Sequence, residues 1–291
     1  MSADLERRSV VVTGASSGIG LATVRMLLGR GVRVYGAVRH EDDADRLARE
    51  IGPAFVPLVL DLRDGEAINA AAAEVRAELG GRTLLGLVNN AAVVLPGPVL
   101  FQPFDEIQEQ IETDLLGTIR ITRAFAPLLG ADWTLKGEPG RIVMMSSTGG
   151  KLGQPFLSGY LASKTGLEAF TETLRRELQL FGIDVAVIGP ACASTPIWDK
   201  ARPARGRYAG TPYWSSFDSA LDKLTTVSRR QGVSPETLAD SVWHALSARR
   251  PRRRYTPARH PILEGAIARA TSTRLLDRLF DLALGLRPSR R

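Results

Sequence analysis

The fold of this chain is decided by one stretch near its N-terminus, Thr13-Gly14-Ala15-Ser16-Ser17-Gly18-Ile19-Gly20. A short apolar run over 9–13 precedes this stretch, and a helical pattern over 19–30 follows it. Glycine at its three positions permits a tight turn and a close approach of the backbone to phosphate groups. The N-terminus of the following helix adds unpaired N–H groups and a positive dipole. The stretch therefore predicts a pyrophosphate site between a strand and a helix.

Strands and helices alternate along the chain after this turn. Short apolar segments bounded by turn residues predict strands, and segments with helical period separate them. Predicted strands cover 9–13, 32–38, 54–60, 84–89, 141–146, 184–188 and 253–256, and predicted helices cover 19–30, 42–51, 64–79, 104–129, 159–181, 234–248 and 261–286. This order predicts an α/β fold, a Rossmann-type doubly wound parallel sheet with helices on both faces. Ligands then bind at the edge where the strands end.

A second motif, Tyr160-Leu161-Ala162-Ser163-Lys164, lies 13 residues after Ser147. Tyr160 and Lys164 are four residues apart and therefore share one face of a helix. An ammonium group held there favours the charged form of a neighbouring phenol, whose ordinary pKa is about 10. The pair thus indicates a proton donor or acceptor. Alone, it is also typical of a solvated pair on an amphipathic helix, an alternative that Ser147 and the upstream turn disfavour.

Size and composition are those of one domain, residues 1–291. The 291 residues are 44% hydrophobic and 24% charged, which suits a sizeable core. The single cysteine, Cys192, excludes an intramolecular disulfide, and the three scattered histidines suggest no metal site. The first ten residues are polar and no apolar run is long enough to span a bilayer. We therefore expect a soluble, cytoplasmic protein without a bound metal.

The net charge of +7 comes largely from arginines late in the chain, within 249–254 and at Arg287, Arg290 and Arg291. Such charge attracts nucleic acid or an anionic membrane, or it forms a solvated basic edge. Because no nucleic-acid motif accompanies it, we favour the solvated edge and expect no nucleic-acid partner.

Together the motifs resemble the classical short-chain dehydrogenase/reductase family, with a looser similarity of the later region to steroid and retinol dehydrogenase-type members. The matching pieces follow the expected order: Thr13–Gly20, Asp61-Leu62, Asn89-Asn90-Ala91, Ser147, Tyr160-x-x-x-Lys164, and Gly189-Pro190 with Thr195. The resemblance implies an NAD(P)-dependent oxidoreductase (EC 1.1.1.-) that moves hydride between a nicotinamide and a ketone or secondary alcohol.

The resemblance also implies a role for each matching residue. Tyr160 would be the general acid or base, Lys164 would lower the tyrosine pKa and bind the nicotinamide ribose, and Ser147 would hydrogen-bond the substrate oxygen. The implied cofactor-binding residues are Gly14, Ser16, Ser17, Gly18, Ile19, Gly20, Arg39, Asp61, Leu62, Asn90, Ala91, Tyr160, Lys164, Pro190 and Thr195.

Arg39 follows the second predicted strand, where an acidic residue would bind a ribose hydroxyl and an arginine accommodates a 2′-phosphate. No acid occurs before Glu41. The sequence therefore favours NADP(H) over NAD(H), although Ser16 and Ser17 stand where many NADP-preferring relatives carry a basic residue. An ordinary exposed arginine is the alternative interpretation.

Three positions depart from the family pattern. Ala92 and Ala191 stand where the family usually has glycine, so that their methyl groups would narrow the pocket. Asp114 occupies the place of the asparagine of the family's catalytic tetrad. An ionised aspartate accepts hydrogen bonds but cannot donate them, which puts the usual proton relay in doubt.

Two late segments predict a substrate-binding region. Residues 191–232 are rich in proline, glycine and aromatic residues, as expected of a long ordered loop or lid with some helix. Residues 257–291 predict a helical extension with a leucine stripe at Leu275, Leu279, Leu282 and Leu286. Most such stripes face the core. The mixed charges beside the stripe favour a helix that closes the pocket or a subunit interface, and peripheral membrane contact is the alternative.

The sequence thus favours an NADP(H)-dependent oxidoreductase, expected as a homodimer or homotetramer, acting on a small lipophilic ketone or secondary alcohol. Two alternatives remain open. One is a non-redox member of the same fold, such as an isomerase, dehydratase or cyclase, which Asp114 favours. The other is a non-catalytic dinucleotide sensor, which the presence of Ser147, Tyr160 and Lys164 disfavours.

Overall fold

A single parallel sheet organises the molecule. The computed structural model describes residues 8–201, 204–258 and 272–286. Within them the sheet has seven strands in the order β3-β2-β1-β4-β5-β6-β7, and every pair is parallel. The strands are β1 Ser9–Thr13, β2 Arg33–Val38, β3 Phe55–Val59, β4 Gly86–Asn89, β5 Arg141–Met145, β6 Asp184–Ile188 and β7 Arg254–Tyr255. The doubly wound α/β fold predicted from the sequence is confirmed.

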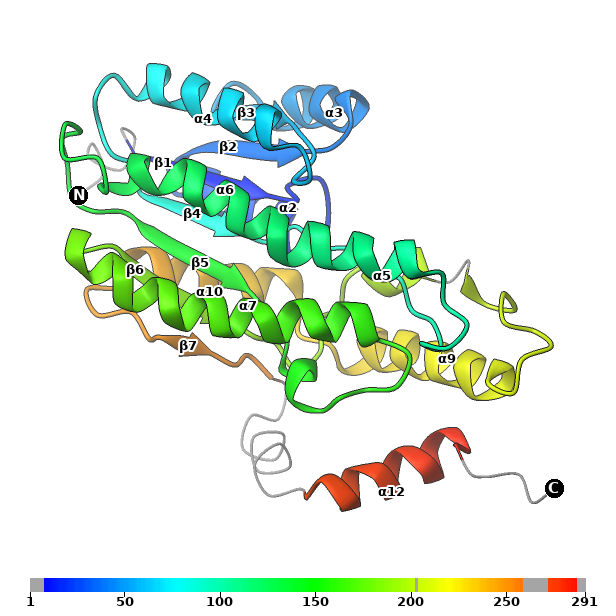
Figure 1. The fold of residues 1–291 in the computed structure, drawn as a ribbon. Helices are drawn as coiled ribbons and strands as arrows, with labels where there is room; N and C mark the ends of the chain where they lie inside the picture. Colours follow the sequence, from blue (N-terminus) through cyan, green and yellow to red (C-terminus); the bar gives the residue numbers. More distant parts are fainter. Residues whose placement is uncertain (1–7, 202–203, 259–271, 287–291) are drawn as a thin grey trace.

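Helices cover both faces of this sheet (Figure 1). One face packs against α4, α6 and α7, and the other packs against α2, α3 and α10. The helices are α2 Gly18–Leu28, α3 Glu41–Ile51, α4 Gly65–Leu79, α5 Phe104–Ile111, α6 Thr118–Phe125, α7 Ser158–Glu177, α8 Ile197–Ala201, α9 Trp214–Gln231, α10 Pro235–Ser247 and α12 Thr273–Leu284. Short 3₁₀ turns extend α6 over Ala126–Leu129 and α7 over Leu178–Phe181 and precede α7 at Thr148–Lys151.

The central strands are buried on both faces. Successive side chains of β1 point into opposite layers, so that Val11 joins one core cluster while Val10 and Val12 join the other. All three are fully buried. This burial explains why the strands appear in the sequence as continuous apolar runs rather than as alternating patterns.

The strand order reverses between β1 and β4, since β2 and β3 lie on one side of β1 and the later strands lie on the other. A crevice forms at such a reversal, outside the carboxyl ends of the strands. The glycine turn follows β1, Asn90 follows β4 and Ser147 follows β5 shortly after its end. The fold therefore brings motifs from distant parts of the sequence to one edge.

Two predicted segments differ from the structure. The helix predicted over 104–129 is interrupted by a π-helical turn, Glu112–Gly117, between α5 and α6. The segment 191–232, predicted as a loop with some helix, contains the 18-residue α9. Of the helical extension predicted over 261–286, α12 is seen, and 261–271 lies outside the described residues.

Candidate active site

The glycine turn is shaped by close backbone contacts. Gly14 has a positive φ of 65°, and a Cβ on Gly20 would lie 2.1 Å from the Gly14 carbonyl oxygen. Thr13 Oγ1 accepts hydrogen bonds of 2.9 Å from the backbone N–H groups of Asn90 and Ala91. The Asn90 amide donates to the Thr13 carbonyl at 2.9 Å. Asn90, predicted to contact the ribose region, therefore also braces the turn.

A cavity of about 510 Å³ opens from this turn along the sheet edge. It is lined by nearly all the residues that the sequence predicts as site residues: Gly14, Ser16, Ser17, Gly18, Ile19, Arg39, Asp61, Leu62, Asn90, Ala91, Ser147, Tyr160, Lys164, Pro190 and Thr195. Gly20 and Asp114 do not line the cavity. Gly20 packs against the Gly14 carbonyl, and Asp114 lies near Lys164. A Cβ on Gly14 would lie 2.9 Å from the Ala91 Cα, so glycine lets the turn pack closely at the N-terminus of α2, where exposed N–H groups suit a phosphate.

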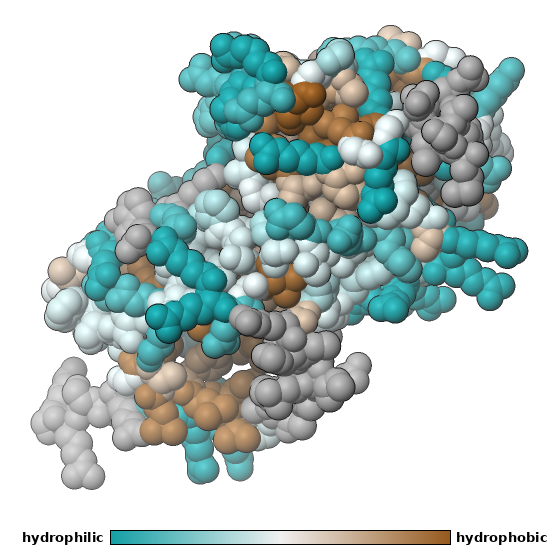
Figure 2. Space-filling view, turned by 180° about the vertical axis from the view of Figure 1, so that it is seen from behind, coloured by the Kyte–Doolittle hydropathy of each residue, from teal (hydrophilic) through white to brown (hydrophobic). Residues whose placement is uncertain are grey.

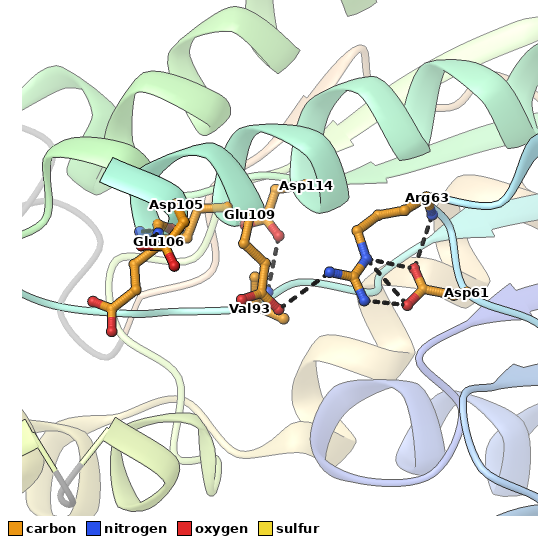
Figure 3. A network of polar contacts seen from close by, with 8 residues as sticks. Asp61, Arg63, Val93, Asp105, Glu106, Glu109 and Asp114 are labelled. Atoms are coloured by element: carbon orange, nitrogen blue, oxygen red, sulfur yellow. Dashed lines mark hydrogen bonds and ion pairs between the residues drawn. The ribbon is translucent and has the colours of Figure 1, made fainter. Parts of the chain in front are cut away.

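Charged groups gather at the end of the cavity next to β2. The exposed Arg39 lines it together with Asp61. The guanidinium of Arg63 binds both oxygens of Asp61, the shortest contact being 2.7 Å (Figure 3). This pairing holds the pKa of Asp61 below its usual range. Arg46 donates to the Ser16 carbonyl at 3.2 Å and pairs with Asp43 at 2.7 Å.

Sequence reasoning missed Arg46 and Arg63. Arg63 could have been found, because it lies two residues after Asp61 in the same turn. Arg46 lies on α3, 30 residues after Ser16, and nothing in the sequence pairs these two residues.

Tyr160, Lys164 and Ser147 converge at the other end of the cavity. Tyr160 and Lys164 lie on one face of α7, and the Lys164 ammonium lies 5.6 Å from the centroid of the Tyr160 ring. Lys164 Nζ donates to the Met145 carbonyl at the end of β5, at 3.2 Å. Ser147 and Tyr160 both line the cavity, and Ser147 Oγ accepts a hydrogen bond from the Gly149 N–H at 3.1 Å. The two hydroxyl groups can therefore meet one substrate oxygen.

Asp114 lies behind this group with its side chain fully buried. The π-helical turn carries it, and its carboxylate accepts a hydrogen bond from the Val93 N–H at 2.8 Å (Figure 3). Its second oxygen lies 3.9 Å from Lys164 Nζ and 3.5 Å from the Ser163 hydroxyl. Asp114 thus reaches the reacting groups through Lys164, and it contacts Val93 on the segment that follows β4.

Burial dominates the electrostatics of these groups. It raises the pKa of Asp114 to about 6 against the opposing effect of the Lys164 charge. It lowers the pKa of Lys164, which the Asp114 carboxylate partly offsets. Burial, with the Asp114 charge adding to it, raises the pKa of Tyr160 above its ordinary value, and the hydrogen bond with Ser147 opposes this rise. The net effect on the Tyr160 pKa is therefore a rise, and the lowering by Lys164 that the resemblance implies stays a prediction.

An apolar wall completes the cavity beside Tyr160. Leu157, Trp198 and Leu224 line it, and they belong to or pack against a buried cluster that also contains Val94 and Leu161. Leu224 and Val227 belong to α9, which lies in the segment predicted as a loop with some helix. Cys192 also lines the cavity.

The site combines a glycine turn where the strand order reverses with a pair of hydroxyl groups beside a buried lysine. This combination defines a Rossmann-type dinucleotide-dependent oxidoreductase. The family profile described as short chain dehydrogenase matches residues 8–206. The chain belongs to this family and is an NAD(P)-dependent short-chain dehydrogenase/reductase.

Named relatives fall into this family. The chain is 35% identical over 273 residues to the NADPH-dependent 3-dehydrocapnine reductase of Ornithobacterium rhinotracheale, covering 94% of this chain and 96% of that protein. It is 33% identical to retinol dehydrogenase 16 of Mus musculus, covering 87% and 81% of the two chains.

Solved structures agree with this assignment. A variant of actinorhodin polyketide ketoreductase with NADPH is 30% identical, with a TM-score of 0.71 over 87% of this chain and 96% of that one. A short-chain dehydrogenase/reductase from Burkholderia phymatum in complex with NAD has a TM-score of 0.75 at 24% identity, covers 98% and 97%, and shares the fold.

Membrane-spanning helices and metal-ligand clusters are both absent from the described residues. None of their helices is long and apolar enough to cross a membrane. Nor do they bring together three or more histidine, cysteine, aspartate or glutamate side chains in a way that could hold a metal ion.

Proposed function

We propose that the protein reduces a lipophilic ketone to a secondary alcohol with NADPH. The observation that carries the proposal is the convergence of the Ser147 and Tyr160 hydroxyls in front of the buried Lys164. A general acid must hold its proton before the reaction. A phenol whose pKa is at or above its ordinary value of about 10 holds this proton near neutral pH, so Tyr160 can serve as the acid of a reduction.

The chemistry divides among three side chains. The bound nicotinamide supplies the hydride. Ser147 donates a hydrogen bond to the carbonyl oxygen and so stabilises the negative charge that develops there. Tyr160 donates its phenolic proton to the same oxygen, and Lys164 stabilises the phenolate that remains. Asp114 is a positioning residue in this scheme, since it touches Lys164 and not the reacting atoms.

Arg39 supports the preference for NADP(H). Its exposed guanidinium borders the cavity at the end of β2, where a 2′-phosphate would lie. A guanidinium matches phosphate oxygens in charge and geometry. The NADPH dependence of the relative from Ornithobacterium rhinotracheale points the same way.

The apolar wall supports a lipophilic substrate. Leu157, Trp198 and Leu224 line the cavity, and Tyr160 packs against the same apolar cluster. Apolar pocket walls favour apolar ligands, with a few polar groups fixing orientation. We expect the reductase to act in the cytoplasm as a homodimer or homotetramer.

Turnover with a panel of lipophilic ketones tests the proposal. The purified protein is mixed with NADPH and each ketone, nicotinamide absorbance is followed, and products are analysed. Consumption of NADPH with formation of the alcohol supports the reductase. Product without consumption supports a non-redox enzyme, and binding without turnover supports a dinucleotide sensor.

A further inference from the structure

The first turn of α3 places a carboxylate at the cofactor end of the cavity. Asp43 lines this end together with Ser16, Arg39 and His40, and its side chain is 32% exposed. Hydrophilic side chains gather at the top of the molecule in Figure 2, the end where α3 lies in Figure 1. An ionised carboxylate here repels a phosphate group that enters the same end of the cavity.

Arg46 pairs with this carboxylate from one helical turn further along α3. Residues three apart share a helix face, and Arg46 Nη2 donates to Asp43 Oδ1 at 2.7 Å. The same nitrogen donates to the Ser16 carbonyl of the glycine turn at 3.2 Å, and Nη1 lies 3.7 Å from Glu50 Oε2. Arg46 is not among the residues that line the cavity. The cavity therefore meets the acid, and the arginine holds the acid from outside the lining.

The pair keeps Asp43 ionised while offsetting its charge. The hydrogen bond from Arg46 holds the pKa of Asp43 below its usual range, so the carboxylate stays charged near neutral pH. Because the two opposite charges are in contact, their fields largely cancel at the distance of a bound cofactor. Without Arg46, a full negative charge would face the cavity.

This charge bears on the choice between the two nicotinamide cofactors. NADP(H) carries a 2′-phosphate on the adenosine ribose, which Arg39 attracts and an unshielded Asp43 repels. NAD(H) carries a hydroxyl group there, which a carboxylate accepts as a hydrogen-bond donor. The balance between the cofactors thus depends on whether the charge of Asp43 is offset.

We propose that Arg46 sets the cofactor preference by shielding Asp43 from the 2′-phosphate of NADP(H). The inference rests on the proposed use of NADP(H) and adds a residue that acts without touching the cofactor. Direct contact of Arg46 with the phosphate is the competing arrangement. The structure favours shielding, because Nη2 of Arg46 is already bound to Asp43 and to the Ser16 carbonyl.

Titration of the full chain with NADPH and with NADH, followed by nicotinamide fluorescence, tests the proposal. Arg46→Gln is expected to shift the ratio of the two dissociation constants about tenfold toward NADH, the order expected for an exposed carboxylate near a dianionic phosphate. The shift is expected to shrink with added salt. The double variant Asp43→Asn with Arg46→Gln is expected to return the ratio to within about threefold of the wild type, because the repelling charge is then gone.

Two controls separate shielding from a structural effect. Arg49→Gln removes an exposed arginine of the same helix, whose guanidinium donates to the Asp45 carbonyl, and is expected to keep the wild-type ratio. Loss of the contact between Arg46 and the Ser16 carbonyl loosens the glycine turn for both cofactors alike and leaves the ratio unchanged. Should Arg46→Gln fail to fold, Arg46→Met replaces it in both variants.

Two results would overturn the shielding role. One is an unchanged ratio in Arg46→Gln. The other is a double variant shifted as far as Arg46→Gln alone, which would assign Arg46 to direct contact with the phosphate. A wild type that binds NADH more tightly would contradict the proposed use of NADP(H), yet a further shift by Arg46→Gln that the double variant reverses would still support shielding. The failure of either proposal is therefore recognised separately.

Discussion

Residues 9–188 and residues 191–286 contribute to the same cavity in different ways. The first region builds strands β1 to β6 and most of the two large buried clusters, and α10 and β7 of the second region complete the cluster on one face. The second region also adds α8, α9 and α12, of which α12 has no buried residue. Cofactor recognition thus rests on closely packed backbone, whereas the substrate wall rests on helices laid over the edge of the sheet. The cofactor half is expected to tolerate little change and the lid to vary more freely.

The largest expected effect lies in the first region, at Tyr160. Tyr160→Phe is expected to lower turnover by about 10²–10⁴, because the phenol supplies the proton to the substrate oxygen. The dissociation constant of NADPH is expected to stay within a few-fold of the wild type, since the ring is retained. Steady-state kinetics and NADPH fluorescence titration measure the two quantities. A variant with near-wild-type turnover would remove Tyr160 from proton transfer.

Core truncation compares the two regions directly. Leu87→Ala in β4 removes a fully buried side chain and is expected to lower the free energy of unfolding by about 2–5 kcal/mol. Leu279→Ala on α12 removes a half-exposed side chain. It is expected to change the free energy of unfolding by at most about 0.5 kcal/mol. Urea denaturation of both variants measures the difference. Equal losses would mean that α12 is part of the core.

Asp114→Asn is expected to stabilise the protein more at about pH 8 than at about pH 5. Burial raises the pKa of Asp114 to about 6 in the folded protein, above its value in the unfolded chain. Its contribution to stability is therefore fully present below about pH 4 and is lost as the pH rises through 6. Asparagine does not titrate, so the Asp114→Asn variant avoids this loss. Above about pH 6 its free energy of unfolding is expected to exceed that of the wild type by at most about 3 kcal/mol.

Urea denaturation at the two pH values checks this gain, with Asp184→Asn on the exposed start of β6 as the control. The same change in stability at both pH values would show that Asp114 does not titrate in this range. The pH profile of turnover is expected to lose an inflection near pH 6 in the Asp114→Asn variant, because Lys164 then has a neutral neighbour.

Cofactor preference sharpens the comparison within the first region. Arg39→Asp is expected to shift the ratio of the NADP(H) and NAD(H) dissociation constants by about 10–100-fold toward NAD(H), because a charge-assisted contact is lost and a hydroxyl acceptor is gained. Arg49→Asp, at an exposed arginine on α3, is the control. Titration of all three proteins with both cofactors gives the ratios, and an unchanged ratio in Arg39→Asp would exclude a phosphate contact.

The difference between local sequence patterns and tertiary contacts explains which parts of the fold and site could be predicted from the sequence. The strands and the glycine turn are local patterns, and the fold follows from their order. The π-helical turn that carries Asp114 keeps an ordinary helical period in the sequence, so its extra residue leaves no local signal. Helix α9 lies in a segment whose prolines and aromatics suggest a loop, and it is stabilised by tertiary packing of Phe217, Ala220 and Leu221. Contacts such as Arg46 with Ser16 depend on how α3 docks beside the turn.

The central claim is that hydride passes from the bound nicotinamide to a ketone carbon while Tyr160 supplies the proton. The most direct measurement uses NADPH with deuterium at both C4 positions, a panel of lipophilic ketones, and mass spectrometry of the products. The account predicts an alcohol with one deuterium on the carbinol carbon, formed by the wild type and nearly absent with Tyr160→Phe. A product without deuterium, or tight NADPH binding with no product from any ketone, would contradict it.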